Sequence, residues 1–126
     1  MTIRITRPLA THLLTLAQQS STQPICGLVG AQHAHPRTVY PLNTAQSDDI
    51  QTTVTSLQQQ NETLFAVYYS HPQQAAIPSV QDITQLQLDN LSNPYYLVIS
   101  LNIKGVLEMR AWQRVGQEFD EVELTV

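Results

Sequence analysis

The sequence predicts a single α+β domain over residues 1–126, with a mixed, mostly antiparallel sheet and about three helices. Three observations support this prediction. The length of 126 residues suits one ordinary domain with a proper hydrophobic core. Stretches with helical spacing alternate with short apolar runs up to about residue 94, and the remainder reads as consecutive strands. No internal repeat or linker divides the chain.

The first elements are a short strand and a helix. Residues Thr2 to Thr6 alternate in polarity, and Pro8 then occupies a position that the first turn of a helix tolerates well. Apolar residues follow at helical spacing, so we expect this helix to end near Gln19. Ser20 to Pro24 form a polar break.

A hairpin, a second helix and a buried strand come next. The runs Ile25–Gly30 and Thr38–Pro41 predict paired strands, joined by a turn over Gln32–Pro36. Ser47 is a good helix N-cap and is followed by two acidic residues, which predicts a helix that ends near Gln60. Leu64–Tyr69 is an apolar and aromatic run typical of a central strand.

The remaining part begins with a third predicted helix. It starts at Ser79 and stops at Asn93-Pro94. Strands are then predicted at Tyr95–Leu101, Val106–Trp112 and Phe119–Val126, with turns between them. Consecutive strands with short turns imply an antiparallel end to the sheet.

Composition and charge exclude several classes of function. Hydrophobic residues make up 42% of the chain and charged residues 13%, and no run approaches the ~20 apolar residues that span a bilayer. The start of the chain reads as a strand rather than a signal peptide, so we expect a cytoplasmic protein without a membrane partner. The formal charge of −4 and scattered basic residues argue against a nucleic-acid partner.

The single cysteine, Cys26, excludes an internal disulfide and a multi-cysteine zinc cluster. It lies within an apolar strand, Ile-Cys-Gly-Leu-Val-Gly. A buried structural thiol is therefore favoured over a nucleophile.

The stretch from Tyr68 to Asp82 is the best candidate site. It joins a predicted strand to a predicted helix and places His71, Ser79 and Asp82 where one metal or substrate would meet all three. Each residue also has a structural explanation. Ser79 and Asp82 have the spacing of a helix N-cap and its acidic partner, and a histidine before a proline is common in loops.

Taken together, the residues resemble a known family. Ser70-His71-Pro72, seven spacer positions from Pro72 to Pro78, and Ser79-Val80-Gln81-Asp82 match the second half of the motif of the JAMM/MPN domain of zinc-dependent isopeptidases. Further similarities are Cys26-Gly27-Leu28, Asn43 and Arg110-Ala111-Trp112. The resemblance is strongest to small stand-alone bacterial members and covers nearly the whole chain. It implies the MPN fold, which is cytidine-deaminase-like.

The resemblance also implies roles for individual residues. In the family, two histidines and an aspartate bind zinc, a glutamate takes a proton from the zinc-bound water, and a serine helps to hold the oxyanion. Carried over, His71 and Asp82 are zinc ligands and Ser79 is the oxyanion serine. The first histidine falls on Tyr69 and the glutamate on Pro24.

Both departures weaken the chemistry. Tyr69 would bind zinc only as phenolate, with a pKa near ~10 in model peptides, and two remaining ligands are too few for a tight site. Pro24 has no group that accepts a proton, and Gln23 beside it cannot act as a base. His33 and His35 lie roughly 17 Å or more from the start of their strand, unless a loop folds back or a second subunit contributes. Glu62 is likewise distant, seven positions before Tyr69.

We therefore interpret the chain as a member with an incomplete zinc site, with zinc absent or weakly bound. The resemblance implies a binding or assembly module, whose partner is a ubiquitin-like or sulfur-carrier protein tail or an active relative. The alternatives are an active zinc metallopeptidase acting on such a tail, a metal-independent enzyme using Tyr69, His71 and Ser79, and a nucleobase deaminase. Deaminase chemistry is disfavoured because neither His-x-Glu nor Pro-Cys-x-x-Cys occurs. A homo-oligomer is left open.

Overall fold

A seven-stranded sheet with the order β1-β7-β6-β5-β4-β2-β3 forms the centre of the protein. The computed structural model describes residues 2–20, 22–42, 47–72, 74–79, 81, 94–101 and 107–126. The helices are α1 (Arg7–Gln19) and α2 (Ser47–Gln59). The strands are β1 (Thr2–Arg4), β2 (Cys26–Gln32), β3 (His35–Leu42), β4 (Thr63–His71), β5 (Tyr95–Leu101), β6 (Leu107–Val115) and β7 (Glu118–Thr125).

The sheet is mixed and mostly antiparallel, which confirms the predicted α+β class. Strand pairs β1–β7 and β4–β5 are parallel, and the other four pairs are antiparallel. The predicted third helix after Ser79 falls largely on residues 82–93, which lie outside the described residues. Within the part of the chain that the structure describes, no helix is long and apolar enough to cross a membrane.

The first helix begins where the sequence predicts. Thr6 is the N-cap, and its hydroxyl accepts a hydrogen bond from the backbone N–H of Leu9 at 3.3 Å, while Pro8 follows in the first turn. Leu9, Leu13 and Ala17 recur at helical spacing and are buried. The side chains on this stripe therefore hold α1 against the sheet.

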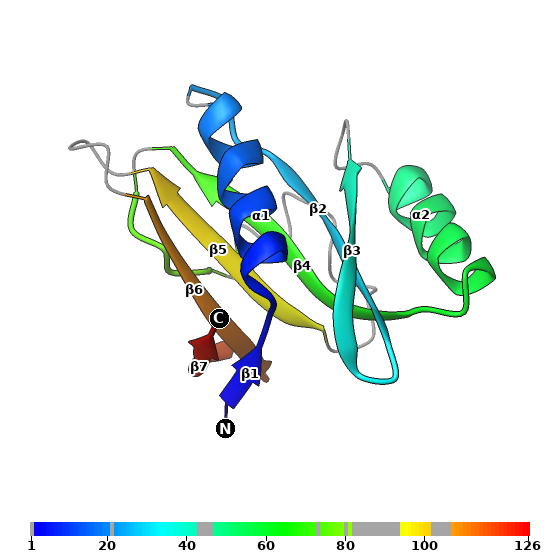
Figure 1. Cartoon of the computed structure of the whole chain (residues 1–126). Coiled ribbons are helices and arrows are strands. Elements are labelled where there is room, and N and C mark those ends of the chain that lie inside the picture. The colour runs from blue at the N-terminus through cyan, green and yellow to red at the C-terminus, as the bar shows by residue number, and fades with distance from the viewer. Residues whose placement is uncertain are drawn as a thin grey trace.

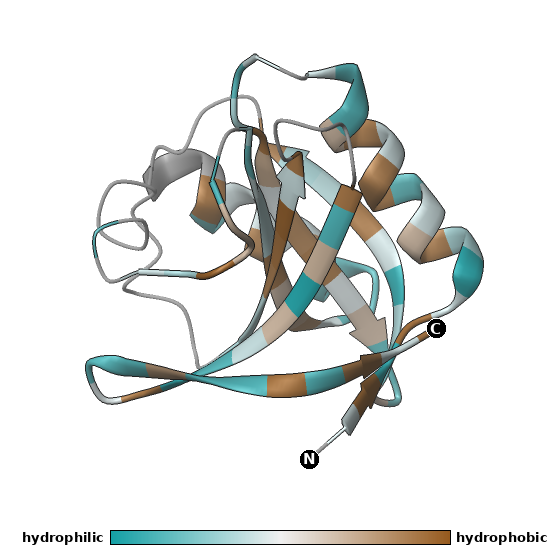
Figure 2. Cartoon of the chain, turned by 90° about the vertical axis from the view of Figure 1, so that its left-hand side faces the viewer, coloured by the Kyte–Doolittle hydropathy of each residue, from teal (hydrophilic) through white to brown (hydrophobic). Residues whose placement is uncertain are grey.

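The two helices cover opposite faces of the sheet (Figures 1 and 2). One hydrophobic cluster contains the buried face of α1 and one set of alternating strand residues, including Val29, Tyr68 and Leu97. The other contains Ile50 of α2 and the opposite set, including Leu28, Val67, Tyr69, Val98 and Trp112. The second cluster continues into the end of β4, so it forms the floor of the candidate site.

The hairpin turn is tighter than predicted. The strands extend to Gln32 and from His35, so the turn contains only His33 and Ala34 instead of the predicted Gln32–Pro36. Both turn residues have left-handed φ angles, 52° and 65°. Two-residue turns of this kind usually contain Asn or Gly, so His-Ala gives no recognisable signal in the sequence.

A buried carboxylate connects the start of β4 to the edge strand β3. Glu62 lies one residue before β4, and 3% of its side chain is exposed. It accepts hydrogen bonds from the Thr38 hydroxyl at 2.6 Å and from the Tyr40 hydroxyl, and its carboxylate lies 3.5 Å from Nε of Arg37. A Cβ atom at Gly30 would lie 2.6 Å from the Glu62 carboxylate, so glycine leaves room for this cluster. All three partners come from β3, so the carboxylate fixes the edge of the sheet.

The pairing of β2 with β4 brings the Tyr68 ring directly over Gly27. These two residues are paired in the β2–β4 ladder, and a Cβ atom at Gly27 would overlap the ring. Burial, with a smaller contribution from Cys26, raises the pKa of the Tyr68 hydroxyl. The glycine of the Cys-Gly-Leu sequence is therefore required by packing.

Replacing Glu62 with Gln should lower the pKa of Tyr40. Burial and then the hydrogen bond and charge of Glu62 raise this pKa to about 12, because the phenol donates to a carboxylate. The folded-state pKa lies above the unfolded value of ~10, so this stabilisation is complete below about pH 10 and is lost as pH rises toward 12. Ring carbon NMR of labelled tyrosine across the alkaline range measures the change.

The matched control for this experiment is Glu108→Gln, which removes an exposed carboxylate paired with Arg110. It should leave the titration of Tyr40 unchanged. Identical Tyr40 titrations in the wild type and Glu62→Gln would contradict the role of this carboxylate.

Substituting Gly27 with Ala should destabilise the protein by about 1–3 kcal/mol, because the added methyl group must displace the Tyr68 ring. In a Tyr68→Ala background the same substitution should cost less than about 0.5 kcal/mol. A double-mutant cycle from urea unfolding measures this coupling. Additive effects of the two substitutions on the free energy of unfolding would show that the need for glycine at position 27 does not come from contact with the Tyr68 ring.

Candidate functional site

The candidate site lies at the end of β4, where the chain leaves the sheet. Tyr69 and His71 are two positions apart on this strand, so both side chains lie on the face covered by α2. Tyr69 pairs with Cys26 of β2, and His71 is in register with Ser100 of β5. Strand β4 thus lies between β2 and β5, and the side chains of Tyr69 and His71 are flanked by residues of both strands.

The orientation of the His71 ring is fixed by the loop that follows it. Its Nδ1 lies 2.8 Å from the carbonyl oxygen of Ala75. A carbonyl oxygen only accepts a hydrogen bond, so Nδ1 of His71 is the donor. A histidine that binds a metal through one nitrogen commonly donates from the other in this way. The ring is thus prepared as a ligand, and it also has a structural role.

Two further side chains hold the same loop. The Ser100 hydroxyl donates to the carbonyl of Gln74, and the Trp112 indole Nε1 donates to the carbonyl of Ala76 at 2.9 Å. Together with His71, side chains from the three adjacent strands β4, β5 and β6 thus form hydrogen bonds with the carbonyls of three consecutive loop residues. We call residues 74–76 with these three side chains the loop anchor. It gives the loop a defined position with protein groups alone.

Neither Ser100 nor the loop contact of Trp112 was predicted. Trp112 was noted only as part of a family-like sequence, and Ser100 carries no motif. The available signal was the strand register, because Ser100 stands beside His71 only once β4 and β5 pair in parallel.

Tyr69 packs as a core residue. It is 2% exposed and belongs to the hydrophobic cluster that contains Cys26, Val98 and Trp112. Its ring meets the His71 ring edge to face, with ring centroids 5.4 Å apart and an interplanar angle of 62°. The phenol ring therefore lies beside the imidazole, at the position where the family has its other histidine ligand.

Pro24 is exposed and precedes β2 by two residues. The strand start beside it is fixed by Ser70, whose hydroxyl accepts from the backbone N–H of Ile25 at 2.9 Å. The N–H of Ser70 in turn donates to the carbonyl of Ile25 at 3.0 Å. The backbone at the base position is thus well ordered, but its side chain cannot accept a proton.

The other predicted site residues are only partly described. Ser79 is exposed at the end of the described loop. Asp82 and the helix predicted to carry it lie outside the described residues, as does Asn43. The structure therefore neither joins Asp82 to His71 nor separates them.

No substitute ligand approaches His71 within the described ranges. His33 and His35 lie at the far end of the β2–β3 hairpin, whereas Tyr69 pairs with Cys26 at the opposite end of β2. Glu62 precedes the first residue of β4, whereas His71 is the last. Among the residues that the structure describes, no group of three His, Cys, Asp or Glu side chains is placed to hold a metal.

Cys26 also lacks the features of a nucleophile. It is buried, and burial raises the pKa of its thiol. A protonated, inaccessible thiol is unreactive, which agrees with a structural role.

The donor set at the two altered positions does not suit zinc. Tyr69 is a buried phenol among apolar side chains, and Pro24 offers no donor atom and no base. Only the imidazole of His71 has a ligand-like arrangement among the described residues. The described part of the site therefore does not fit a catalytic zinc ion.

Comparison with solved structures gives the same fold. A protein of Desulfitobacterium hafniense matches with a TM-score of 0.77 and 23% identity, over 98% of this chain and 91% of that chain. A JAB1/MPN domain protein from Archaeoglobus fulgidus matches with a TM-score of 0.65 and 15% identity, over 98% of this chain and all of its own. A structure described as a metalloprotease-like zinc site in the proteasome and signalosome matches with a TM-score of 0.62 and 15% identity over the full length of both chains.

Comparison with curated proteins gave no match. A sequence model of the prokaryotic homologs of the JAB domain, in contrast, matches residues 6–115. This range includes α1, the β2–β3 hairpin, the candidate site and the strands up to the end of β6. The chain therefore belongs to the prokaryotic homologs of the JAB domain.

Proposed function

We propose that this chain is a non-catalytic member of the JAB family, working as a binding or assembly module. The observation that carries the proposal is the packing of Tyr69, which is 2% exposed and lies edge to face with His71 at the position of a zinc ligand. The loss of the base at Pro24 points the same way. Simultaneous loss of a ligand and the base is the expected result of relaxed catalytic demand.

The loop anchor supports a binding role. Because Ser100, His71 and Trp112 hold three consecutive loop carbonyls, the loop does not need a metal to stay in place. A preformed surface reduces the entropy lost on binding a partner. His71 on this interpretation positions the loop.

The partner we propose is the extended tail of a ubiquitin-like or sulfur-carrier protein, or an active relative. Strand β3 is the last strand of the sheet, and its residues 37–40 lie between Pro36 and Pro41, which cannot donate to a ladder. A tail that paired with this segment would add a strand to the sheet. Continuing past Leu42, which pairs with Cys26, it would approach Tyr69 and His71.

The alternative is a zinc-dependent metallopeptidase that cleaves such a tail. It is favoured by the tautomer of His71, whose Nδ1 donates to Ala75 and leaves Nε2 as the acceptor. This function requires chelator-sensitive cleavage that is lost in His71→Ala and in Asp82→Ala.

Metal analysis separates the two functions. Protein purified without chelator should contain far less than one zinc per chain, because Tyr69 and Pro24 supply neither ligand nor base. The double variant Tyr69→His, Pro24→Glu should take up zinc, and adding His71→Ala to it should abolish that uptake. Circular dichroism of each variant checks that the fold is retained.

Close to one zinc per wild-type chain would sink the non-catalytic proposal. A folded double variant that takes up no zinc would mean that the site is remodelled beyond these two positions.

Binding of a tail should be visible by NMR. Titration of labelled protein with ubiquitin and with a sulfur-carrier protein should shift amide signals of residues 37–42 and of the loop anchor, because these line the proposed path. The same proteins lacking their flexible tails are the matched controls and should cause no shifts. Equal shifts with and without the tail would contradict binding along this edge.

A further inference from the structure

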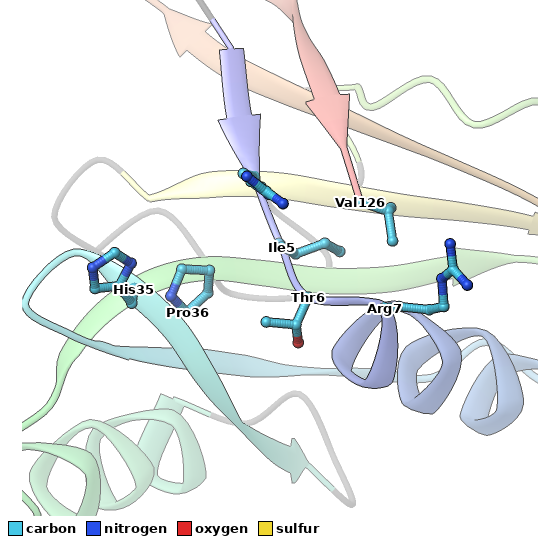
Figure 3. A pocket seen from close by; sticks show the side chains of 7 residues that line it. Ile5, Thr6, Arg7, His35, Pro36 and Val126 are labelled. Atoms are coloured by element: carbon cyan, nitrogen blue, oxygen red, sulfur yellow. The ribbon is translucent and has the colours of Figure 1, made fainter.

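A hollow lies at the junction of β1 and α1, away from the candidate site (Figure 3). It has a volume of about 520 Å³ and lies within the size range of small-molecule sites. Residues from three segments of the chain line it: Arg4, Ile5, Thr6, Arg7, His35, Pro36 and Val126. The pairing of β7 with β1 brings Val126 close to the segment of Arg4–Arg7.

Basic groups are concentrated around this hollow. Arg4 lies at the end of β1, Arg7 at the start of α1 and His35 at the start of β3, and Figure 3 shows Arg7 and His35 on opposite sides of the segment that joins β1 to α1. No acidic side chain is among the lining residues. Two of the lining side chains, Arg4 and Arg7, thus carry a positive charge, although the chain has a formal charge of −4.

The other described arginines already have partners. Arg37 lies beside the Glu62 carboxylate, Arg110 beside Glu108 and Glu121, and Arg114 donates to the carbonyl of Gly116. By contrast, no carboxylate within the described ranges comes within ion-pairing distance of Arg4 or Arg7. Arg4 and Arg7 thus both line the hollow, and none of the other lining side chains is acidic.

The remaining walls are apolar, with one hydroxyl. Ile5 is 1% exposed and Pro36 is buried, so both form the floor, whereas Val126 is 55% exposed at the rim. The Thr6 hydroxyl accepts from Leu9 N–H and still has its own proton to donate. Apolar walls with a few converging polar groups are typical of sites for small organic ligands.

We propose that this hollow binds a small molecule that carries an oxyanion, carboxylate or phosphate, on an apolar body. Arg4 and Arg7 would pair with the oxyanion, since guanidinium groups match both anions in geometry and charge. The apolar body would contact Ile5, Pro36 and Val126. The hollow is separate from the candidate site. His35 pairs with Gln32 at one end of β2, whereas Tyr69, two residues before His71, pairs with Cys26 at the other end.

Amide NMR titration tests the proposal with defined probes at constant ionic strength. Phenyl phosphate and phenylacetate carry the two anions on the same ring, benzyl alcohol is their neutral counterpart, and inorganic phosphate lacks the apolar body. We expect saturable shifts at residues 4–7, 35 and 36 with at least one aryl anion, at a Kd of about 1 mM or tighter. Tighter binding of one aryl anion identifies which oxyanion the site prefers.

Arginine variants distinguish a specific binding site from non-specific attraction of anions to positive charge. Arg4→Gln and Arg7→Gln should each weaken binding roughly tenfold. Arg110→Gln removes an equal charge from another exposed arginine and should leave the affinity unchanged. All variants should keep the amide spectrum of the folded wild type outside the hollow.

Several results would overturn the proposal. These are an absence of saturable shifts with both aryl anions, equal binding of benzyl alcohol, equal weakening by Arg110→Gln, and inorganic phosphate binding as tightly as phenyl phosphate. None of them bears on zinc or tail binding at His71, so the two proposals fail independently.

Discussion

Buried polar side chains at the two ends of β4 must find hydrogen-bond partners, and the surrounding structure is arranged by this requirement. At the start of the strand, Glu62 collects donors from Thr38, Tyr40 and Arg37, which fixes the edge strand β3. At its end, His71 donates to Ala75 and so fixes the loop that leaves the sheet. Within the described part of the chain, no buried side-chain polar atom is left without a partner. One central strand thereby determines both an edge and a loop.

Local signals in the sequence were sufficient to predict most elements. Pro8 marks the first turn of α1, and the strand at Tyr95–Leu101 was predicted with its observed bounds. These features depend on neighbouring residues only. The turn was predicted too wide because the left-handed backbone of His33 and Ala34 is unusual for these residue types, and the hairpin strands pair further than their polarity suggests.

The candidate site was predictable in one half. The motif identified His71 and the altered residues Tyr69 and Pro24, because these depend on spacing along the chain. The partners in the loop anchor, Ser100 and Trp112, depend on which strands become neighbours. Tertiary pairing between segments about 30 residues apart or more cannot be read from local pattern. The same holds for Arg4 and His35, which meet only in the folded chain.

The pairing of β1 with β7 also affects how the protein can form. Thr2 is in register with Glu123, so β1 can join the sheet only when the β7 segment, far along the chain, is present. The segment of α1 and β1 must then remain undocked on the β7 side while the chain is being synthesised, although the β2–β3 hairpin can already close through local contacts. The outer strand of this edge therefore forms only after β7 is available, and the hollow that Arg4, Arg7 and Val126 share depends on the same pairing.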